Sequence, residues 1–414
     1  MPPRHRYFPS MRRIDIEERR ARLAVRHHLA TATRAAGAAD AAGGVVALHG
    51  TDAASVYLSA VARMRAPTLE GIEAALYADR SLVRILGMRR TIFVLPVELA
   101  PVVQAACTDA IAAKERRKLV AALTEAGVDI GTHADMAGWL ADLGDSAVHA
   151  LCARGQALSV ELSADEPRLR KQFVVAQGKT YEATVSVAGR LLPILAAEGR
   201  IVRGRPRGSW LSTQYRWEPA EAWLPSGTSG TSGTSGALAT WDAASAQAEL
   251  VRRWLGRFGP GTLADLKWWT GLTVGEVKRA LTAVRPVEVD LGGTQGFVLA
   301  EDAGPVAAPE PWVALLPALD PTPMGWTERD WYLGAHRAPL FDRSGNIGPT
   351  VWCDGRIVGG WAQRKDGEIA VRMLEDIGDR AKEVTAAAES LAGRLGPSRF
   401  VPKFRTPLER ELAE

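Results

Sequence analysis

The chain has 414 residues, of which 47% are hydrophobic and 24% are charged. This length is too great for one ordinary hydrophobic core, and the composition is that of a soluble globular protein with two to four domains. The formal net charge of +4 and the pI near 9.0 permit an anionic partner without demanding one, since a small excess spread evenly steers a ligand very little.

The three cysteines, Cys107, Cys152 and Cys353, lie far apart and form no C-x-x-C pair. The sequence therefore predicts neither a zinc knuckle nor a disulfide framework, and we expect a cytoplasmic protein in a reducing compartment. The arginine-rich residues 1–34 contain no apolar h-region, and no window approaches eighteen uninterrupted apolar residues. We therefore expect neither a signal peptide nor a membrane-spanning helix.

Residues 14–30 carry the apolar periodicity of a helix. Its charged face holds four arginines, Arg19, Arg20, Arg22 and Arg26. Two interpretations are open: a solvated helix face, which is favoured until the fold is known, or a basic helix that lies along phosphates.

The stretch most suggestive of chemistry is residues 45–52, where an apolar run ends in a short polar bend. A helix is predicted over residues 53–64, and Thr51 and Asp52 are its candidate N-caps. The partial positive charge of a helix N-terminus disfavours imidazolium, so His49 is expected to be neutral and able to accept a proton. A hydrogen-bonded structural histidine is the alternative.

A further helix is predicted over residues 69–77, followed by two β-rich runs within residues 82–96 that flank a Gly-Met-Arg-Arg centre. This order of helix, strand and basic turn is typical of a winged helix. Three arginines are expected where such a wing meets a nucleic-acid backbone: Arg84, Arg89 and Arg90.

Helices are predicted over residues 97–126, 133–153 and 185–198, with Trp139 and Leu140 as core residues. A strand-turn-strand with a Gly-Arg-Pro-Arg-Gly tip follows and indicates a second wing. It carries Arg200, Arg203, Arg205 and Arg207. Two interpretations of these arginines are open: they bind phosphate, or they only make an exposed loop tip soluble. The first is supported because glycines allow close approach of the backbone and arginines suit bidentate phosphate contacts.

Residues 226–236 repeat Ser-Gly-Thr and predict a flexible linker. A helix over residues 241–258 precedes a helix-turn-helix pattern over residues 263–283, in which Lys278 and Arg279 are the candidate DNA contacts. Three tryptophans of this region are expected in the core: Trp254, Trp268 and Trp269.

Beyond residue 287 the chain is β-rich, with an Asp-Gly hairpin at residues 354–355 and a last helix at 380–395.

As a set, these segments resemble the winged-helix DNA glycosylases typified by AlkZ. The resemblance is carried by Leu48-His49-Gly50-Thr51-Asp52, Leu82-Val83-Arg84 with Met88-Arg89-Arg90-Thr91, Arg200-Ile201-Val202-Arg203-Gly204 with Gly208-Ser209-Trp210, Phe258-Gly259-Pro260-Gly261-Thr262 with Trp268-Trp269, Leu315-Leu316-Pro317 with Asp320, and Asp354-Gly355-Arg356-Ile357-Val358-Gly359.

The resemblance implies an α+β fold of tandem winged-helix units followed by a small β-barrel or sheet, arranged around a channel for duplex DNA. The expected segments are a first winged-helix unit with the catalytic motif (1–130), a second unit (131–225), the linker (226–236), a third helix-turn-helix unit (237–285), and a barrel-like region with a terminal helix (286–414). It further implies a monofunctional glycosylase that uses no metal and no cofactor and excises bulky N-alkylated purines, including crosslinked ones. The basic residues of the predicted wings suit phosphates, so we expect contacts with double-stranded DNA mainly through phosphates, and we expect a monomer.

The family's catalytic Gln-x-Gln, or Gln-x-Asp/Glu, falls on His49 and Thr51, so this chain departs from the pattern at both positions. An N7-alkylated purine is already cationic and needs no general acid, so the enzyme need only place water and favour an oxocarbenium-like sugar. His49 can orient that water and accept its proton, with Thr51 as partner on the same side of a strand. Asp52 either orients the imidazole or, as we favour, caps the helix.

Two other functions stay open from the sequence. The first is a non-catalytic DNA-binding or regulatory protein that keeps the winged-helix channel without the catalytic glutamines. The second is a protein-interaction module, which the arginines of both predicted wings disfavour.

Overall fold

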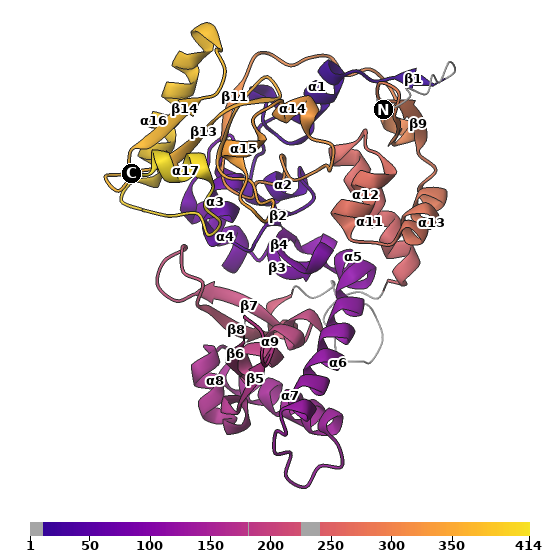
Figure 1. The fold of residues 1–414 in the computed structure, drawn as a ribbon, viewed down its shortest axis with the longest axis vertical. Coiled ribbons are helices and arrows are strands. Elements are labelled where there is room, and N and C mark those ends of the chain that lie inside the picture. The colour runs from indigo at the N-terminus through magenta and orange to yellow at the C-terminus, as the bar shows by residue number, and fades with distance from the viewer. Residues whose placement is uncertain (1–10, 181, 225–240) are drawn as a thin grey trace. The chain divides into compact units, whose positions relative to one another are not determined.

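The computed structural model describes residues 11–180, 182–224 and 241–414, which form two compact units (Figure 1). The first unit comprises Met1–Leu82, Thr91–Pro96 and Gln247–Glu414, and the second comprises Val83–Arg90 and Val97–Ala246. The predicted linker at 226–236 lies outside the described residues.

The N-terminal part of the first unit is a small helical group with short strands. Its elements are β1 (Arg12–Arg13), α1 (Ile16–Arg26), α2 (Ala38–Gly43), β2 (Leu48–His49), α3 (Ala53–Val61), α4 (Leu69–Tyr77) and β4 (Thr91–Pro96). Strand β2 pairs antiparallel with β4. The predicted first helix ends at Arg26 rather than at residue 30, because His28 adopts a left-handed φ of 57° that a helix cannot continue through.

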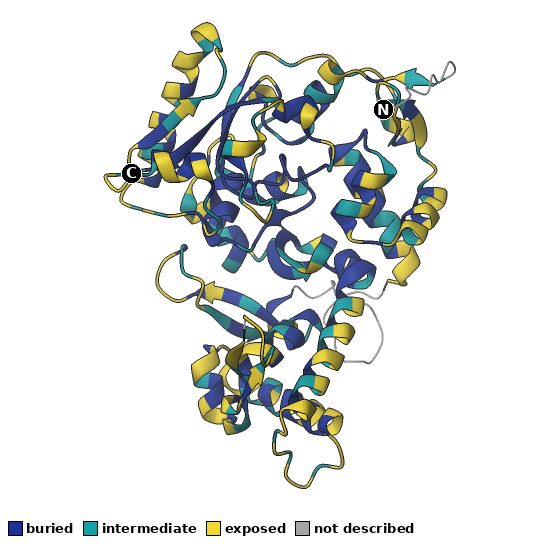
Figure 2. Cartoon of the chain, viewed as in Figure 1, coloured by how far each residue is buried: buried dark blue, intermediate teal, exposed yellow. Residues whose placement is uncertain are grey.

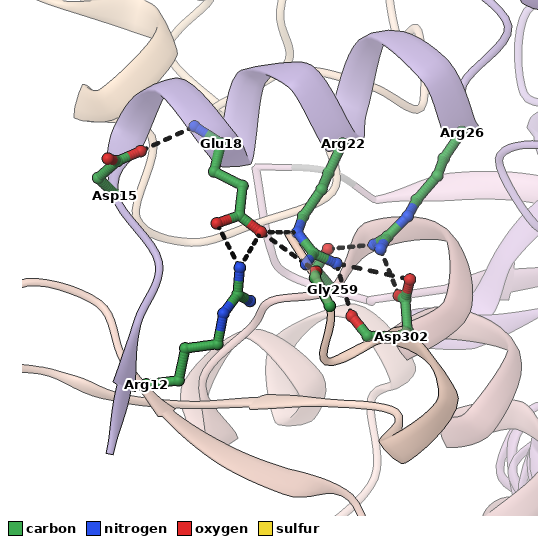
Figure 3. A network of polar contacts seen from close by, with 8 residues as sticks. Arg12, Asp15, Glu18, Arg22, Arg26, Gly259 and Asp302 are labelled. Carbon is green, nitrogen blue, oxygen red and sulfur yellow. Dashed lines mark hydrogen bonds and ion pairs between the residues drawn. The ribbon is translucent and has the colours of Figure 1, made fainter. Parts of the chain in front are cut away.

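The arginines of α1 do not form the solvated face that the sequence favoured, and they do not lie free along a surface either. Arg22 is 1% exposed; it bonds the Glu18 carboxylate at 2.6 Å and the carbonyl oxygen of Asp302 at 3.0 Å (Figure 3). Arg26 donates to the carboxylate of Asp302 and to the carbonyl oxygen of Gly259. Buried guanidinium groups require such partners, so these arginines hold α1 against segments more than 230 residues away in sequence.

The three helices predicted between residues 241 and 283 are present as α11 (Ala243–Phe258), α12 (Leu263–Thr270) and α13 (Val274–Val284). They are followed by the hairpin β9 (Val287–Asp290) and β10 (Gln295–Val298), to which β1 adds a parallel strand. Thr262 and Thr273 cap α12 and α13 through capping boxes, and Gly271 ends α12 at φ 76°. Trp254 and Trp269 are buried as predicted, and Trp268 is half-buried.

The C-terminal part of the first unit contains an open antiparallel sheet of four strands in the order β11-β12-β13-β14. Its elements are β11 (Val313–Leu316), α14 (Asp330–Leu333), α15 (Arg337–Leu340), β12 (Thr350–Cys353), β13 (Arg356–Gln363), β14 (Ile369–Met373), α16 (Ala381–Leu395) and α17 (Pro407–Leu412). The predicted hairpin is confirmed: Asp354 and Gly355 both have positive φ, as a two-residue turn of this kind requires. Of the two predicted forms, the open sheet is correct, because β11 and β14 do not pair within the described residues and no closed barrel forms.

The second unit combines helices with five short strands. Its elements are β3 (Leu82–Gly87), α5 (Ala100–Val103), α6 (Asp109–Glu125), α7 (Met136–Arg154), α8 (Ser159–Asp165), β5 (Gln172–Val175), β6 (Ala183–Ser186), α9 (Val187–Ala197), β7 (Ile201–Pro206), β8 (Tyr215–Pro219) and α10 (Ala220–Trp223). Trp139 and Leu140 lie in its core as predicted. Buried and exposed residues alternate along the helices of this unit (Figure 2).

The second wing is the antiparallel pair β7–β8, but its tip is not the predicted Gly-Arg-Pro-Arg-Gly. Strand β7 continues through Pro206, which pairs with Tyr215, so the turn begins at Arg207. The register between β7 and β8 shifts between Arg203 and Pro206, so the Gly-Arg-Pro segment lies within an irregular part of the strand. A bulge of this kind tolerates proline within a strand, which is why the glycines and the proline gave a misleading turn signal.

Candidate functional site

His49 closes strand β2 immediately before the bend that leads into α3. It lies opposite Phe93 of β4, and the two rings meet edge to face with their centroids 5.7 Å apart. The Gly50 N–H extends the ladder by donating to the Ile92 carbonyl oxygen at 2.7 Å. His49 has only 9% of its surface exposed. Strand β4 therefore positions its imidazole ring, through the backbone pairing and through contact with Phe93.

Thr51 and Asp52 form the bend between β2 and α3. Thr51 is half-buried and lies beyond the end of the strand. Asp52 is the N-cap of α3: Oδ1 accepts the Ala54 N–H at 3.1 Å, and Oδ2 accepts the Lys403 N–H at 3.1 Å. Both carboxylate oxygens thus accept backbone N–H groups, which is the capping role favoured for Asp52. The shared orientation of His49 and Thr51 toward one water stays a prediction.

A buried polar network behind α3 was not predicted from the sequence. Arg63 and Asp320, both fully buried, form a two-pronged ion pair with N–O distances of 2.7 and 2.8 Å. Ser59 donates to the same carboxylate at 2.7 Å. Asp320 belongs to the segments that carry the family resemblance, but neither its neighbourhood nor that of Arg63, just beyond the end of α3, indicates that the two residues pair.

The same network extends to the N-terminal helix. Thr322 accepts from Arg63 at 2.7 Å and lies 2.9 Å from His27 Nδ1. Burial, followed by the charge of Arg63, lowers the pKa of His27 well below its ordinary value, so this imidazole is neutral. Helix α3, which begins at the candidate motif, is therefore anchored to the segment that follows β11.

An aromatic series connects strand β4 to the third helix-turn-helix. Phe93 contacts Trp269 of α12 with centroids 6.3 Å apart, and Trp269 contacts Phe258 of α11 at 5.9 Å. His49 therefore belongs to a packed core that includes the third winged-helix unit, although the two are more than 200 residues apart in sequence.

In the second unit, the structure brings together two of the predicted phosphate-binding arginines. The guanidinium of Arg84 lies 4.6 Å from the ring centroid of Tyr215, and that of Arg203 lies 5.1 Å from the ring centroid of Trp217. Burial, and next the positive charge of Arg84, lowers the pKa of Arg203 to about 10. Two cations stacked on neighbouring rings of β8 form a site that an anion would stabilise.

The other arginines of the two wings differ in their surroundings. Arg205 and Arg207 are exposed at the end of β7. Arg200 is paired with Asp145 at 2.7 Å, and Arg90 with Glu115 at 3.0 Å. Arg89 is half-buried and adopts a left-handed φ of 55° in the turn after β3.

Lys278 and Arg279 are exposed on α13 in the first unit. They occupy the second helix of the helix-turn-helix, where a recognition helix carries its contacts. The predicted DNA-binding residues are thus distributed over both units: Lys278 and Arg279 in the first, and the seven arginines of the two wings in the second.

Across the residues that the structure describes, no group of three or more histidine, cysteine or acidic side chains is arranged to hold a metal ion. Within the same residues, no helix is long and apolar enough to cross a membrane.

The repeated combination of short helices with a two-stranded wing places this chain among tandem winged-helix proteins. Residues 42–396 match the family described as DNA glycosylase AlkZ-like, and the chain belongs to that family.

Two similarities to a Streptomyces sahachiroi protein accompany this match. A relative named interstrand DNA cross-link repair glycosylase is 31% identical over 171 residues, which cover 37% of this chain and 44% of that protein. The solved structure of Streptomyces sahachiroi DNA glycosylase AlkZ has the same fold, with a TM-score of 0.69 at 21% identity over 94% of this chain and 99% of that one. The sequence similarity thus spans less than half of the curated relative's length.

Proposed function

We propose that this protein is a DNA repair glycosylase that hydrolyses the N-glycosidic bond of purines alkylated at N7 or N3, including bulky or crosslinked adducts, in duplex DNA. One observation carries the proposal: a chain of the AlkZ-like DNA glycosylase family holds a histidine on a short strand directly before the capped N-terminus of a helix.

In the proposed reaction, water adds to C1′ of the sugar as the bond to the base nitrogen breaks. The alkylated base is cationic and leaves as a neutral molecule, so no proton donor is required. His49 accepts the proton of the attacking water, and Thr51 holds that water in place. Asp52 supports the reaction indirectly, because its cap on α3 fixes the bend that carries both residues.

The proposed DNA contacts are phosphate contacts. Arg84 of β3 and Arg203 of β7, each stacked on a ring of β8, supply cations together with the exposed Arg205 and Arg207 at the end of β7. Arg89, Arg90 and Arg200 add charge in the second unit, and Lys278 and Arg279 do so on α13. Because such contacts are to the backbone, we expect affinity that falls steeply with salt and depends weakly on sequence.

The deciding experiment is single-turnover release of base from a duplex that carries N7-methylguanine or a bulkier N7 adduct. We expect release by the wild type, a loss of about 100-fold or more in His49→Ala, and retained release in His49→Gln, because glutamine can also orient water by hydrogen bonds. Circular dichroism of each variant controls for folding.

A non-catalytic DNA-binding protein is the second candidate, favoured by the departure from glutamine at both positions of the family's motif. Tight binding of several adducts without release by the wild type would select it. Affinity for an undamaged duplex that hardly changes between low and moderate salt would contradict both candidates.

A further inference from the structure

The segment between α16 and α17, residues 396–406, passes the bend that leads from β2 into α3 (Figure 1). The Lys403 N–H donates to Oδ2 of Asp52 at 3.1 Å, although the two residues are 351 positions apart in sequence. Asp52 follows His49 by three residues, so this hydrogen bond brings the segment to the candidate catalytic motif. The segment and the motif belong to the same compact unit.

The backbone of this segment is held in place on both sides of Lys403. Before it, the side-chain amide of Gln363 on β13 donates to the Ser398 carbonyl oxygen at 3.0 Å and accepts the Phe400 N–H at 3.1 Å. After it, Thr406 is buried at the start of α17. Because both flanks are fixed, the side chain of Lys403 starts from a defined point beside the motif.

The three cations of the segment have different surroundings. Arg399 donates to four carbonyl oxygens, including that of Asp366 at 2.6 Å. Arg405 bonds both carboxylate oxygens of Glu409, at 2.7 and 3.0 Å. Lys403 is exposed, and its ammonium group forms no ion pair within the described part of the chain. The charge of Lys403 is therefore the one of the three that is available to a ligand.

The carboxylate of Asp52 lies close to Lys403 but does not use its ammonium group. The two carboxylate oxygens accept the backbone N–H groups of Ala54 and Lys403 instead. The N-terminus of α3 adds partial positive charge at the same place. Exposed lysines are common, and this one is distinguished by the fixed contact of its backbone with the motif. A flexible ammonium group at such a position suits a phosphate of a DNA strand.

We propose that Lys403 binds a phosphate of the damaged strand next to the alkylated nucleotide, with its ε-ammonium group donating to a phosphate oxygen. The inference rests on the proposed function, because that function places the alkylated nucleotide at His49. Lys403 is not among the DNA contacts that the sequence predicted, since its position depends on a partner 351 residues away.

The test replaces single phosphates of the damaged strand with neutral methylphosphonates. The duplex carries 2′-fluoro-N7-methylguanine, because the fluorine slows loss of the base and allows equilibrium binding to be measured by fluorescence anisotropy. We expect one methylphosphonate within two nucleotides of the lesion to weaken wild-type binding about fivefold. Lys403→Gln should weaken binding to the unmodified backbone by the same factor, and that methylphosphonate should then have no further effect, because the contact is already lost.

Two further variants serve as controls. Lys403→Arg keeps the charge and should keep the effect of the methylphosphonate. Lys382→Gln removes a lysine charge from an exposed position on α16 and should leave both the affinity and the methylphosphonate effect unchanged. Circular dichroism checks that each variant folds.

Independent losses from Lys403→Gln and from the methylphosphonate at every position near the lesion would overturn the assignment, as would unchanged affinity in Lys403→Gln. Failure of the proposed function gives a different result, since the wild type would then release no base from N7-methylguanine whatever the binding experiment shows.

Discussion

Arg22 and Arg26 of α1 and Arg203 of β7 all lie in arginine-rich stretches of the sequence, but the fold gives them different surroundings. Arg22 and Arg26 are buried against Glu18, Asp302 and backbone carbonyl oxygens, so their charges are used within the fold. Arg203 is stacked on Trp217, beside the charge of Arg84, and forms no ion pair with a carboxylate among the described residues. The charge of an arginine is therefore most available to a ligand where the tertiary structure supplies no carboxylate.

The largest effect is expected from Arg22→Met. Replacing the buried guanidinium removes one of the two arginine partners of Glu18 and the donor to the carbonyl oxygens of Asp302 and Gly304. We expect this loss to cost about 3 kcal/mol in the free energy of unfolding of the first unit. Urea denaturation followed by tryptophan fluorescence measures this loss. An exposed arginine, as in Arg343→Met, serves as the control and should change stability little. Equal stability of Arg22→Met and Arg343→Met would contradict a structural role for Arg22.

The next largest effect is expected from Arg203→Ala. It should lower affinity for undamaged duplex DNA about tenfold, similarly for unrelated sequences, and reduce the slope of log affinity against log salt by about one. Arg205→Ala should act in the same direction. Fluorescence anisotropy at several salt concentrations measures both. A loss confined to one DNA sequence would show base recognition and contradict the assignment to phosphates.

A smaller effect is expected from Lys278→Ala and Arg279→Ala on α13. Both side chains are exposed, so their contacts with phosphate gain less than those of a half-buried, stacked guanidinium, and each variant should lower affinity about threefold. The same anisotropy assay compares them with Arg203→Ala. A larger loss than that of Arg203→Ala would make α13, rather than the wing, the main contact surface.

The smallest effect concerns an arginine of the second unit that does have carboxylate partners. Arg168 bonds Glu166 at 2.8 Å, and this bonding, with the hydroxyl of Ser146, lowers the pKa of Glu166 to about 2. Because the folded value lies below the ordinary value of 4.5, the pair contributes stability above about pH 4.5 that is lost as the pH falls toward 2.

Glu166→Gln should therefore lower stability at neutral pH and flatten its dependence on pH between 4.5 and 2. Urea midpoints at pH 7, 4.5 and 3 measure this difference. Parallel pH profiles of the variant and the wild type would show that Glu166 does not titrate in this range.

Much of the candidate site could be predicted from local sequence. Residues 45–58 contain an apolar run, a bend and a capping aspartate, and the structure has β2, Asp52 as the N-cap and α3 in these places. The capping threonines and Gly271 likewise placed α12 and α13. The helix caps depend on hydrogen bonds between residues two to four apart, so the local sequence contains both partners.

Features that depend on distant partners could not be predicted. Arg63 and Asp320 are 257 residues apart, and nothing in either neighbourhood indicates that they pair in a fully buried site. The tip of the second wing was misplaced for a related reason, since the bulge in β7 is defined by its register with β8.

The sequence alone determined the order of helices and strands, the capped bend at residues 49–52 and the resemblance to winged-helix glycosylases, because these follow from periodicity, local hydrogen bonds and motif order. Only the tertiary structure decided which arginines are buried in ion pairs and which stack on aromatic rings. It also decided that the C-terminal strands form an open sheet. The physical reason is that the environment of a charge is set by whichever distant residue the fold places beside it.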